Sequence, residues 1–186
     1  MLNHLGEFNF GDHWHVRIVT ATLILAATID GIQLKVPNWI TFPMILTGWG
    51  FNLATGGWAG LGWSLVGTAV GLGLLIWLYA IGGMGAGDVK LFAGVGAWML
   101  PEATLIAFCW AAIIGGVIAV AMALACREWR RHQTQFLMIL TEIATIGNPA
   151  ELSAIAAERK SSMRLLPYGI PLAIGSIAYF AWAGML

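Results

Sequence analysis

Long uncharged apolar stretches dominate this chain and restrict the folds open to it. Of its 186 residues, 59% are hydrophobic and only 10% are charged, whereas soluble domains carry roughly 45–50% apolar and 25% charged residues. Several stretches approach the roughly 20 residues that a helix needs to cross a bilayer. We therefore expect an all-α polytopic membrane protein that forms a single domain over residues 1–186. The formal net charge of zero gives no basis for nucleic-acid binding.

Proline and glycine divide the apolar sequence into about six predicted spans. Breaks are expected at Pro37, at Gly56-Gly57, at Gly82-Gly83 and at Pro101, because proline cannot continue a helix and glycine pairs weaken one. The predicted spans cover residues 16–33, 39–54, 58–81, 88–100, 102–126 and 166–186. A polar loop is expected at about 127–165. Its part 136–146 is interpreted either as an interfacial amphipathic helix or as a disordered loop.

The basic residues predict how these spans are oriented. Six of the nine lysines and arginines lie between the last two spans. Lys35 follows the first span, and Lys90 lies by the connection between the third and fourth spans. Six spans would place both on the same side as that loop, and only Arg17 lies on the other side. Because basic loops stay in the cytoplasm, that side is predicted to be cytoplasmic, with both termini outside.

Two aspartates, Asp30 and Asp88, lie within this apolar sequence. An ionised side chain inside a membrane span costs about 2.5–3.5 kcal/mol on insertion scales, so such residues are candidates for function. The predicted topology gives both aspartates the same depth, at the cytoplasmic ends of their spans. Two carboxyl groups that meet share a proton. One can then activate water while the other polarises a carbonyl, which is the chemistry of amide hydrolysis.

Glycines precede the second aspartate. Gly85 and Gly87 would allow a substrate backbone to approach Asp88 closely. The alternative is an ordinary glycine-rich turn in which Asp88 caps the following helix. That alternative accounts for Asp88 but leaves Asp30 unexplained.

The last predicted span opens with Pro167, Tyr168 and Gly169. A proline and a glycine at this place predict a broken helix start near both aspartates, and hence a wall of a substrate site. The alternative is an ordinary helix start with proline in its first turn.

Other residues are interpreted as structural. Gly67, Gly71 and Gly73 predict close helix packing. Several tryptophans near span ends predict interfacial anchors, namely Trp14, Trp39, Trp58, Trp98 and Trp129. A metal site at Asp12, His13 and His15 is the less favoured interpretation of a cluster across the membrane from the aspartates, and no metal or cofactor is expected.

Three motifs together resemble a known family. They are Asp30 with Lys35-Val-Pro-Asn38, then Gly85-Ala-Gly-Asp88-Val-Lys90, then Pro167-Tyr-Gly169. In this order they resemble the type IV prepilin peptidases, which belong to the GxGD class of membrane aspartyl proteases. The resemblance implies that Asp30 and Asp88 are the catalytic pair of an aspartic endopeptidase.

The same resemblance implies the substrate and the location. The substrate would be a prepilin in the lipid bilayer, cut after its short basic leader at the cytoplasmic face of the bacterial inner membrane. The pilus assembly machinery is a further candidate partner, and nucleic acid is not. In size the chain is similar to the short peptidases of tight-adherence (Flp) pilus systems. The cysteine-rich segment of long prepilin peptidases is not seen, so the resemblance does not extend to methyl transfer.

Two other functions compete with the peptidase. In a small proton-coupled transporter, Asp30 and Asp88 would carry protons, and we would expect aspartates near the bilayer midplane and an internal repeat. In a structural subunit of a pilus or secretion assembly, the same site would be inactive.

Overall fold

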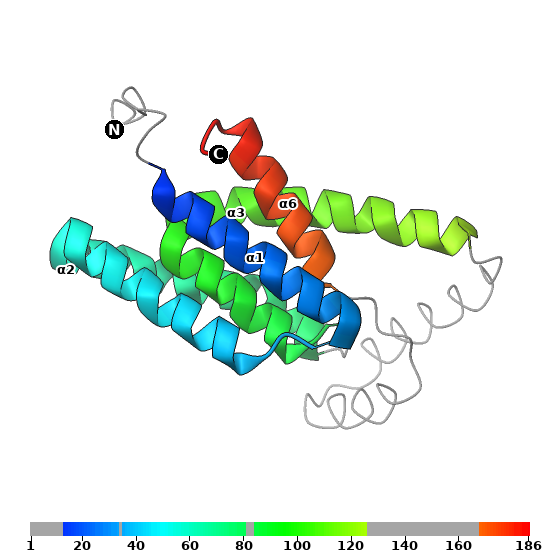
Figure 1. Ribbon diagram of the computed structural model, residues 1–186, viewed down its shortest axis with the longest axis horizontal. Coiled ribbons are helices and arrows are strands. Elements are labelled where there is room, and N and C mark those ends of the chain that lie inside the picture. The colour runs from blue at the N-terminus through cyan, green and yellow to red at the C-terminus, as the bar shows by residue number, and fades with distance from the viewer. Residues whose placement is uncertain (1–12, 34, 81–83, 126–167) are drawn as a thin grey trace.

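The chain is a bundle of long helices. The computed structural model describes residues 13–33, 35–80, 84–125 and 168–186. These residues form α1 (Trp14–Gln33), α2 (Asn38–Ala80), α3 (Ala86–Ala125) and α6 (Gly169–Trp182), with no strand among them (Figure 1). The predicted all-α class is confirmed for this part of the chain. The predicted loop at 127–165 lies outside the described residues.

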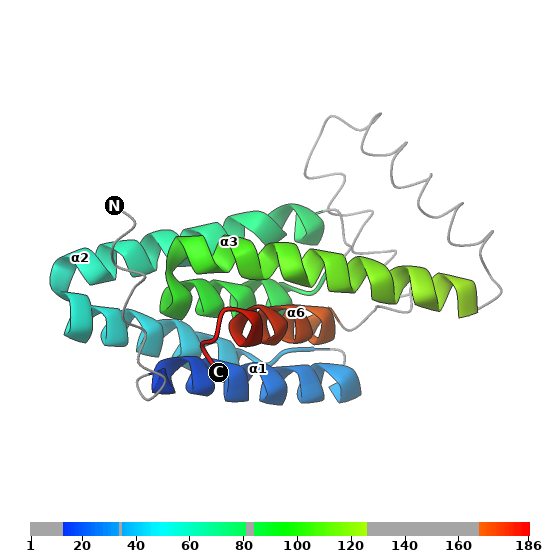
Figure 2. The same cartoon turned by 90° about the horizontal axis from the view of Figure 1, so that it is seen from above.

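α2 and α3 each consist of two helical segments joined by one non-helical residue. In α2 that residue is Gly57, with φ 61° and ψ −151°, a conformation that glycine adopts without steric cost. In α3 it is Leu100, with φ 63° and ψ 170°, directly before Pro101. The breaks expected at the glycine pair and at Pro101 therefore occur, and Figure 2 shows both helices folding back on themselves.

The helical segments agree closely with the predicted spans, while membrane crossing is supported for fewer of them. α1, α2 and α3 are long and apolar enough to cross a membrane, whereas the 14-residue α6 is shorter. These apolar helices are those of an integral membrane protein. The count of six spans stays a prediction.

The first segment of α3 forms the centre of the bundle. Residues 91–99 are all buried, since α2 packs along α3 on one side and α6 packs against α3 and α1. A helix that is apolar all round is typically buried on every side. This short segment is thus surrounded by protein, and its first turn carries Asp88.

Glycines allow α2 and α3 to approach closely. A methyl group added at Gly71 would lie 2.6 Å from the carbonyl oxygen of Phe92, and Gly67 and Gly96 face each other's backbone more closely still. The packing predicted for Gly67 and Gly71 is therefore confirmed. Gly73 faces open space, so the same prediction was wrong there.

One tryptophan differs from the prediction. Trp98 is only 6% exposed, and its indole N–H donates a 2.9 Å hydrogen bond to the backbone oxygen of Met44. Its interpretation as an interfacial anchor was wrong, because it lies in the buried segment of α3. Trp14, Trp39 and Trp58 are exposed, as interfacial anchors would be.

Hydrogen bonds from α2 to one backbone carbonyl of α3, which Pro101 leaves without its helical donor, join the two helices. Pro101 has no N–H, so the carbonyl of Ala97, four residues earlier, lacks its usual helical donor. The buried side chains of Asn52 and Ser64 donate to that oxygen instead, at 2.9 and 2.5 Å. Both segments of α2 are thereby fixed to the helix that presents Asp88.

Candidate active site

Asp30 lies near the C-terminal end of α1 and its carboxylate contacts the start of α6. The residue is only 3% exposed, and the backbone N–H of Gly169 donates a 2.9 Å hydrogen bond to Asp30 Oδ2. Gly169 is the first residue of α6, and helix N-termini favour negative charge. A methyl group at Gly169 would lie 2.8 Å from the same oxygen, so this approach requires glycine.

Asp88 lies in the first turn of α3 and is also buried, at 5% exposed. The backbone N–H of Gly85 donates to Asp88 Oδ2 at 3.3 Å. Gly85 immediately precedes the helix, which makes Asp88 the third helical residue reaching back to the N-cap amide, as in one half of a capping box. The alternative in which Asp88 itself is the N-cap was therefore wrong. Like Asp30, Asp88 places its carboxylate at a helix N-terminus.

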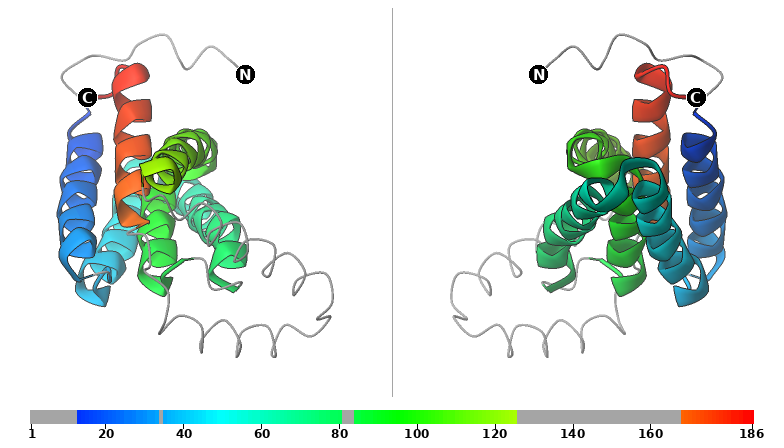
Figure 3. Two further views of the ribbon diagram at one scale, coloured as in Figure 1. Left: turned by 90° about the vertical axis from the view of Figure 1, so that its right-hand side faces the viewer. Right: turned by 90° about the vertical axis from the view of Figure 1, so that its left-hand side faces the viewer.

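Tyr168 directly precedes α6, and its side chain is half-buried. Its neighbour Gly169 holds Asp30. Asp30 therefore lies at the N-terminal end of α6, and Asp88 lies in the first turn of α3 at the same end of the bundle (Figure 3). Pro167, the third residue of the predicted wall, lies outside the described residues.

The connection between α1 and α2 packs against the glycine motif. A methyl group at Gly87 would lie 2.6 Å from the backbone oxygen of Val36 and 2.9 Å from its Cβ. Gly87 therefore allows a close contact within the protein itself. Its predicted contact with a substrate backbone stays a prediction, as does that of Gly85, where a methyl would lie 3.1 Å from Asp88 Oδ2.

Lys90 holds the same connection at a second point. Its Nζ donates a 3.1 Å hydrogen bond to Asn38 Oδ1 and lies 5.1 Å from the centre of the Phe42 ring, within reach of a cation–π interaction. In the sequence, Lys90 stands out only as a marker of topology and as part of a motif. The sequence signal for this role was the position of Lys90, two residues after Asp88. Its partner Asn38 could be identified only from the fold.

The helix ends around the aspartates lie at one end of the bundle. Figure 3 shows the C-terminal end of α1 and the N-terminal ends of α2 and α3 in the lower part of both views. Lys35 and Lys90 belong to these ends, whereas Arg17 lies in the first turn of α1 at the other end. Two buried carboxyl groups with oriented amide donors can exchange protons with a water or a carbonyl oxygen between them.

The histidines at the opposite end of α1 form ring contacts. His13 and His15 meet edge to face with centroids 5.8 Å apart, and His15 stacks on Phe51 at 5.3 Å. Asp12, the third member of the less favoured metal site, lies outside the described residues. No group of three potential metal ligands occurs in the part of the chain that the structure describes.

Comparison with known proteins agrees with the resemblance of the motifs. Curated relatives named prepilin leader peptidase/N-methyltransferase include one from Aeromonas salmonicida, 31% identical over 114 residues, which are 58% of this chain and 39% of that protein. The Neisseria gonorrhoeae relative is 36% identical over 115 residues, covering 58% of this chain and 40% of that protein. The alignments thus cover about two fifths of the relatives' length. No solved structure matches the chain.

A family model covers the region that contains both aspartates. The model of the type IV leader peptidase family matches residues 17–120, which is more than half of the chain and includes all of α2 and most of α1 and α3. This chain belongs to the type IV leader peptidase family.

Proposed function

We propose that this protein is a membrane aspartyl endopeptidase that removes the leader peptide of type IV prepilins, with Asp30 and Asp88 as its catalytic pair. Family membership supports leader peptide processing. One structural observation carries the assignment of residues. Two buried aspartates from different helices lie at the same end of the bundle, where the connection that follows the helix of Asp30 packs on Gly87, next to Asp88.

The proposed mechanism uses one ionised and one protonated carboxyl group. The ionised group takes a proton from water as the water oxygen attacks the scissile carbonyl carbon. The protonated group donates its proton to the carbonyl oxygen, which gives a neutral tetrahedral intermediate. Collapse of this intermediate expels the amine, which takes up the proton from the first carboxyl group, while one hydroxyl group of the intermediate returns its proton to the second carboxyl group. Gly85 and Gly169 would orient the carboxylates through their amides.

The proposed substrate site extends the pair of aspartates. Tyr168 and Gly169 would form one wall, and Gly85 and Gly87 would lie beside the scissile bond, together with Pro167. The half-buried side chain of Tyr168, directly before the glycine that bonds Asp30, supports this wall. We propose Flp-type prepilins as the substrates.

The proposed membrane topology has six spans with both termini outside the cytoplasm of a bacterial inner membrane. Positive charge at the aspartate end of the bundle, from Lys35 and Lys90, supports a cytoplasmic location for that end. The cut would therefore take place at the cytoplasmic face. Membership in a leader peptidase family favours this function over the proton-coupled transporter.

Cleavage by the purified full-length chain tests the proposal. The protein in detergent would be incubated with an Flp-type prepilin and, separately, with a prepilin of a long-form type IV pilus system. Mass spectrometry and N-terminal sequencing would identify the products. We expect one cut after the basic leader of the Flp-type substrate, with Asp30→Asn as the inactive control. No cleavage of either substrate, or equal cleavage by the control, would contradict the proposal.

A further inference from the structure

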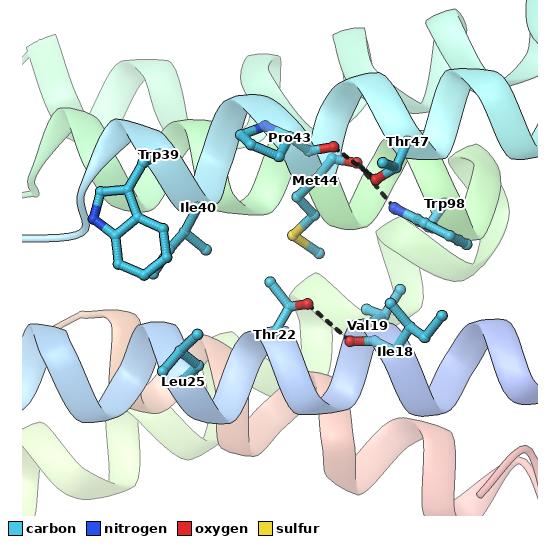
Figure 4. Close-up of a pocket in the computed structure, with 10 residues that line it drawn as sticks. All are labelled: Ile18, Val19, Thr22, Leu25, Trp39, Ile40, Pro43, Met44, Thr47 and Trp98. Atoms are coloured by element: carbon cyan, nitrogen blue, oxygen red, sulfur yellow. Dashed lines mark hydrogen bonds between the residues drawn. The ribbon is translucent and has the colours of Figure 1, made fainter.

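A groove separates α1 from the first segment of α2. α1 packs more extensively against α6 than against α2, which leaves a cavity of about 220 Å³ between the two helices. Figure 4 shows side chains from both helices lining it, with Ile18 and Leu25 on α1 and Ile40 and Thr47 on α2. Trp98 of α3 also lines it. We call this cavity the α1–α2 groove.

The lining of the α1–α2 groove is apolar despite its two threonines. The Thr22 hydroxyl donates a 2.9 Å hydrogen bond to the backbone oxygen of Ile18. The Thr47 hydroxyl donates a 2.6 Å hydrogen bond to the backbone oxygen of Pro43. These bonds, drawn in Figure 4, direct both hydroxyls to their own helices. The indole N–H of Trp98 is likewise bonded to the protein backbone. The groove therefore suits an apolar occupant.

The α1–α2 groove leads away from the candidate active site. Val19, which lines it, lies eleven residues before Asp30, about three helical turns, so both residues share the buried face of α1. On the other wall, Ile40 follows the connection whose Val36 contacts Gly87. A chain held with its scissile bond at the aspartates can therefore continue into the groove without leaving the protein surface.

The rim of the groove is exposed and apolar. Ile18 is 44%, Leu25 46% and Trp39 64% exposed, so an occupant can enter from the side, out of the surrounding lipid. The cavity is smaller than the roughly 300–1,000 Å³ of small-molecule pockets. It suits the few side chains that an apolar helix inserts at positions i, i+3 or i+4, and i+7.

We propose that the α1–α2 groove binds the apolar segment of the substrate that follows the scissile bond. This inference rests on the proposed peptidase function. A short basic leader stays in water, so the part of the substrate that enters the membrane is the part beyond the cut. That part must be helical in lipid, because its backbone groups find no other hydrogen-bond partners. The end of the groove nearest the site has Leu25, five positions before Asp30, and Ile40, four positions after Val36, and the groove offers such a helix an apolar surface.

Filling the groove tests the proposal. Thr22→Phe and Thr47→Phe add rings to it, and the matched controls are Thr28→Phe and Thr55→Phe. All four threonines bond only their own helix in the same way, but the controls do not line the groove. For a full-length prepilin we expect KM to rise about tenfold or more in the groove variants, with KM near wild type in the controls.

A second substrate separates binding in the groove from the chemistry. A short peptide that spans the cut but lacks the apolar segment should be cleaved equally by the wild type and by all folded variants. If the groove variants keep the wild-type KM for the full prepilin, the groove is not the binding site. If the wild-type protein cleaves neither substrate, the proposed function fails and the inference fails with it.

Photo-crosslinking gives a readout that does not depend on a tolerated filling mutation. A benzophenone side chain at Leu25 should crosslink to the apolar segment of a prepilin in detergent or in lipid vesicles. The same side chain at Ile24, on a different face of α1, should not. Crosslinks from Leu25 to lipid alone, with prepilin present in excess, would identify the groove as a lipid site and overturn the proposal.

Discussion

The backbone amide of Gly169 and the carboxylate of Asp30 are 139 positions apart in the sequence and 2.9 Å apart in space. This hydrogen bond joins the last described helix to the first and places Asp30 at a helix N-terminus. Asp88, in the first turn of α3, lies at the same end of the bundle. The site therefore depends on contact between the two ends of the chain.

Replacing either aspartate should abolish cleavage. Asp30→Asn and Asp88→Asn each replace one carboxyl group with an amide of similar shape. The mechanism needs both carboxyl groups, one as base and one as acid. The measurement is prepilin cleavage by each variant, with membrane insertion and detergent melting checked against wild type. A variant that keeps more than a small residual activity would exclude its residue from the mechanism.

Gly169→Ala should lower the cleavage rate strongly, although the substitution adds only one methyl group. The added methyl would lie 2.8 Å from Asp30 Oδ2, and a displacement of about 1 Å in a reacting group can cost about a hundredfold in rate. Gly31→Ala is the matched control, since its methyl would meet only Ile170 at an ordinary 3.5 Å. Cleavage rates of both variants, normalised to folded protein, check this. Equal rates would remove Gly169 from the positioning of Asp30.

Gly87→Ala and Gly85→Ala should both lower turnover, with Gly87→Ala the more severe. At Gly87 the methyl meets the fixed backbone of Val36 at 2.6 Å, whereas at Gly85 it meets the end of the Asp88 side chain at 3.1 Å. We therefore expect Gly87→Ala to lower the melting temperature as well. Turnover measured beside thermal stability separates the roles. Full stability with lost turnover would favour the substrate contact, and normal cleavage by Gly87→Ala would end both interpretations.

Lys90→Met should lower turnover while costing little stability. The Lys90–Asn38 hydrogen bond is exposed, so its loss should change the free energy of unfolding by only about 1 kcal/mol. It nevertheless holds the α1–α2 connection against the first turn of α3, next to Asp88. A double-mutant cycle with Asn38→Ala checks the pairing. Additive effects of the two substitutions on turnover would show that the bond has no role in positioning.

Reporter tags should confirm the topology. Tags between residues 131 and 159 should report the cytoplasm, and tags at either terminus should report the outside, because eight of the nine basic residues would then face the cytoplasm. Cysteine accessibility in intact cells is the measurement. A cytoplasmic N-terminus would contradict the argument from charge.

The helix boundaries could be predicted from sequence because they depend on local chemistry. Gly57 and Pro101 end their helical segments for reasons that act within a few residues. The faces of the helices could not be predicted in the same way. Lipid and protein core are both apolar, so the sequence of residues 91–99 does not distinguish a lipid-facing helix from the buried one observed. Trp98 was misassigned for this reason.

The candidate site could be predicted in part. Asp30 and Asp88 stand out because a carboxylate in an apolar helix is costly. Their surroundings depend on long-range contacts that no local pattern encodes, such as Gly169 with Asp30, Gly87 with Val36 and Lys90 with Asn38. These residues belong to the sequence motifs, but only the fold showed which of them are in contact.

The hydrogen bonds at Ala97 affect the direction in which the chain runs after Pro101. As a continuous helix, the 40 residues of α3 would be about 60 Å long, twice the roughly 30 Å of the hydrocarbon core. Pro101 turns the chain back, and Asn52 and Ser64 fix that reversal by occupying the carbonyl that the proline leaves without a donor. In the proposed topology, α3 would end on the opposite side of the bilayer without this reversal. Gly169 would then emerge on the side opposite Asp30, so one buried carbonyl helps to decide whether the two halves of the site can meet.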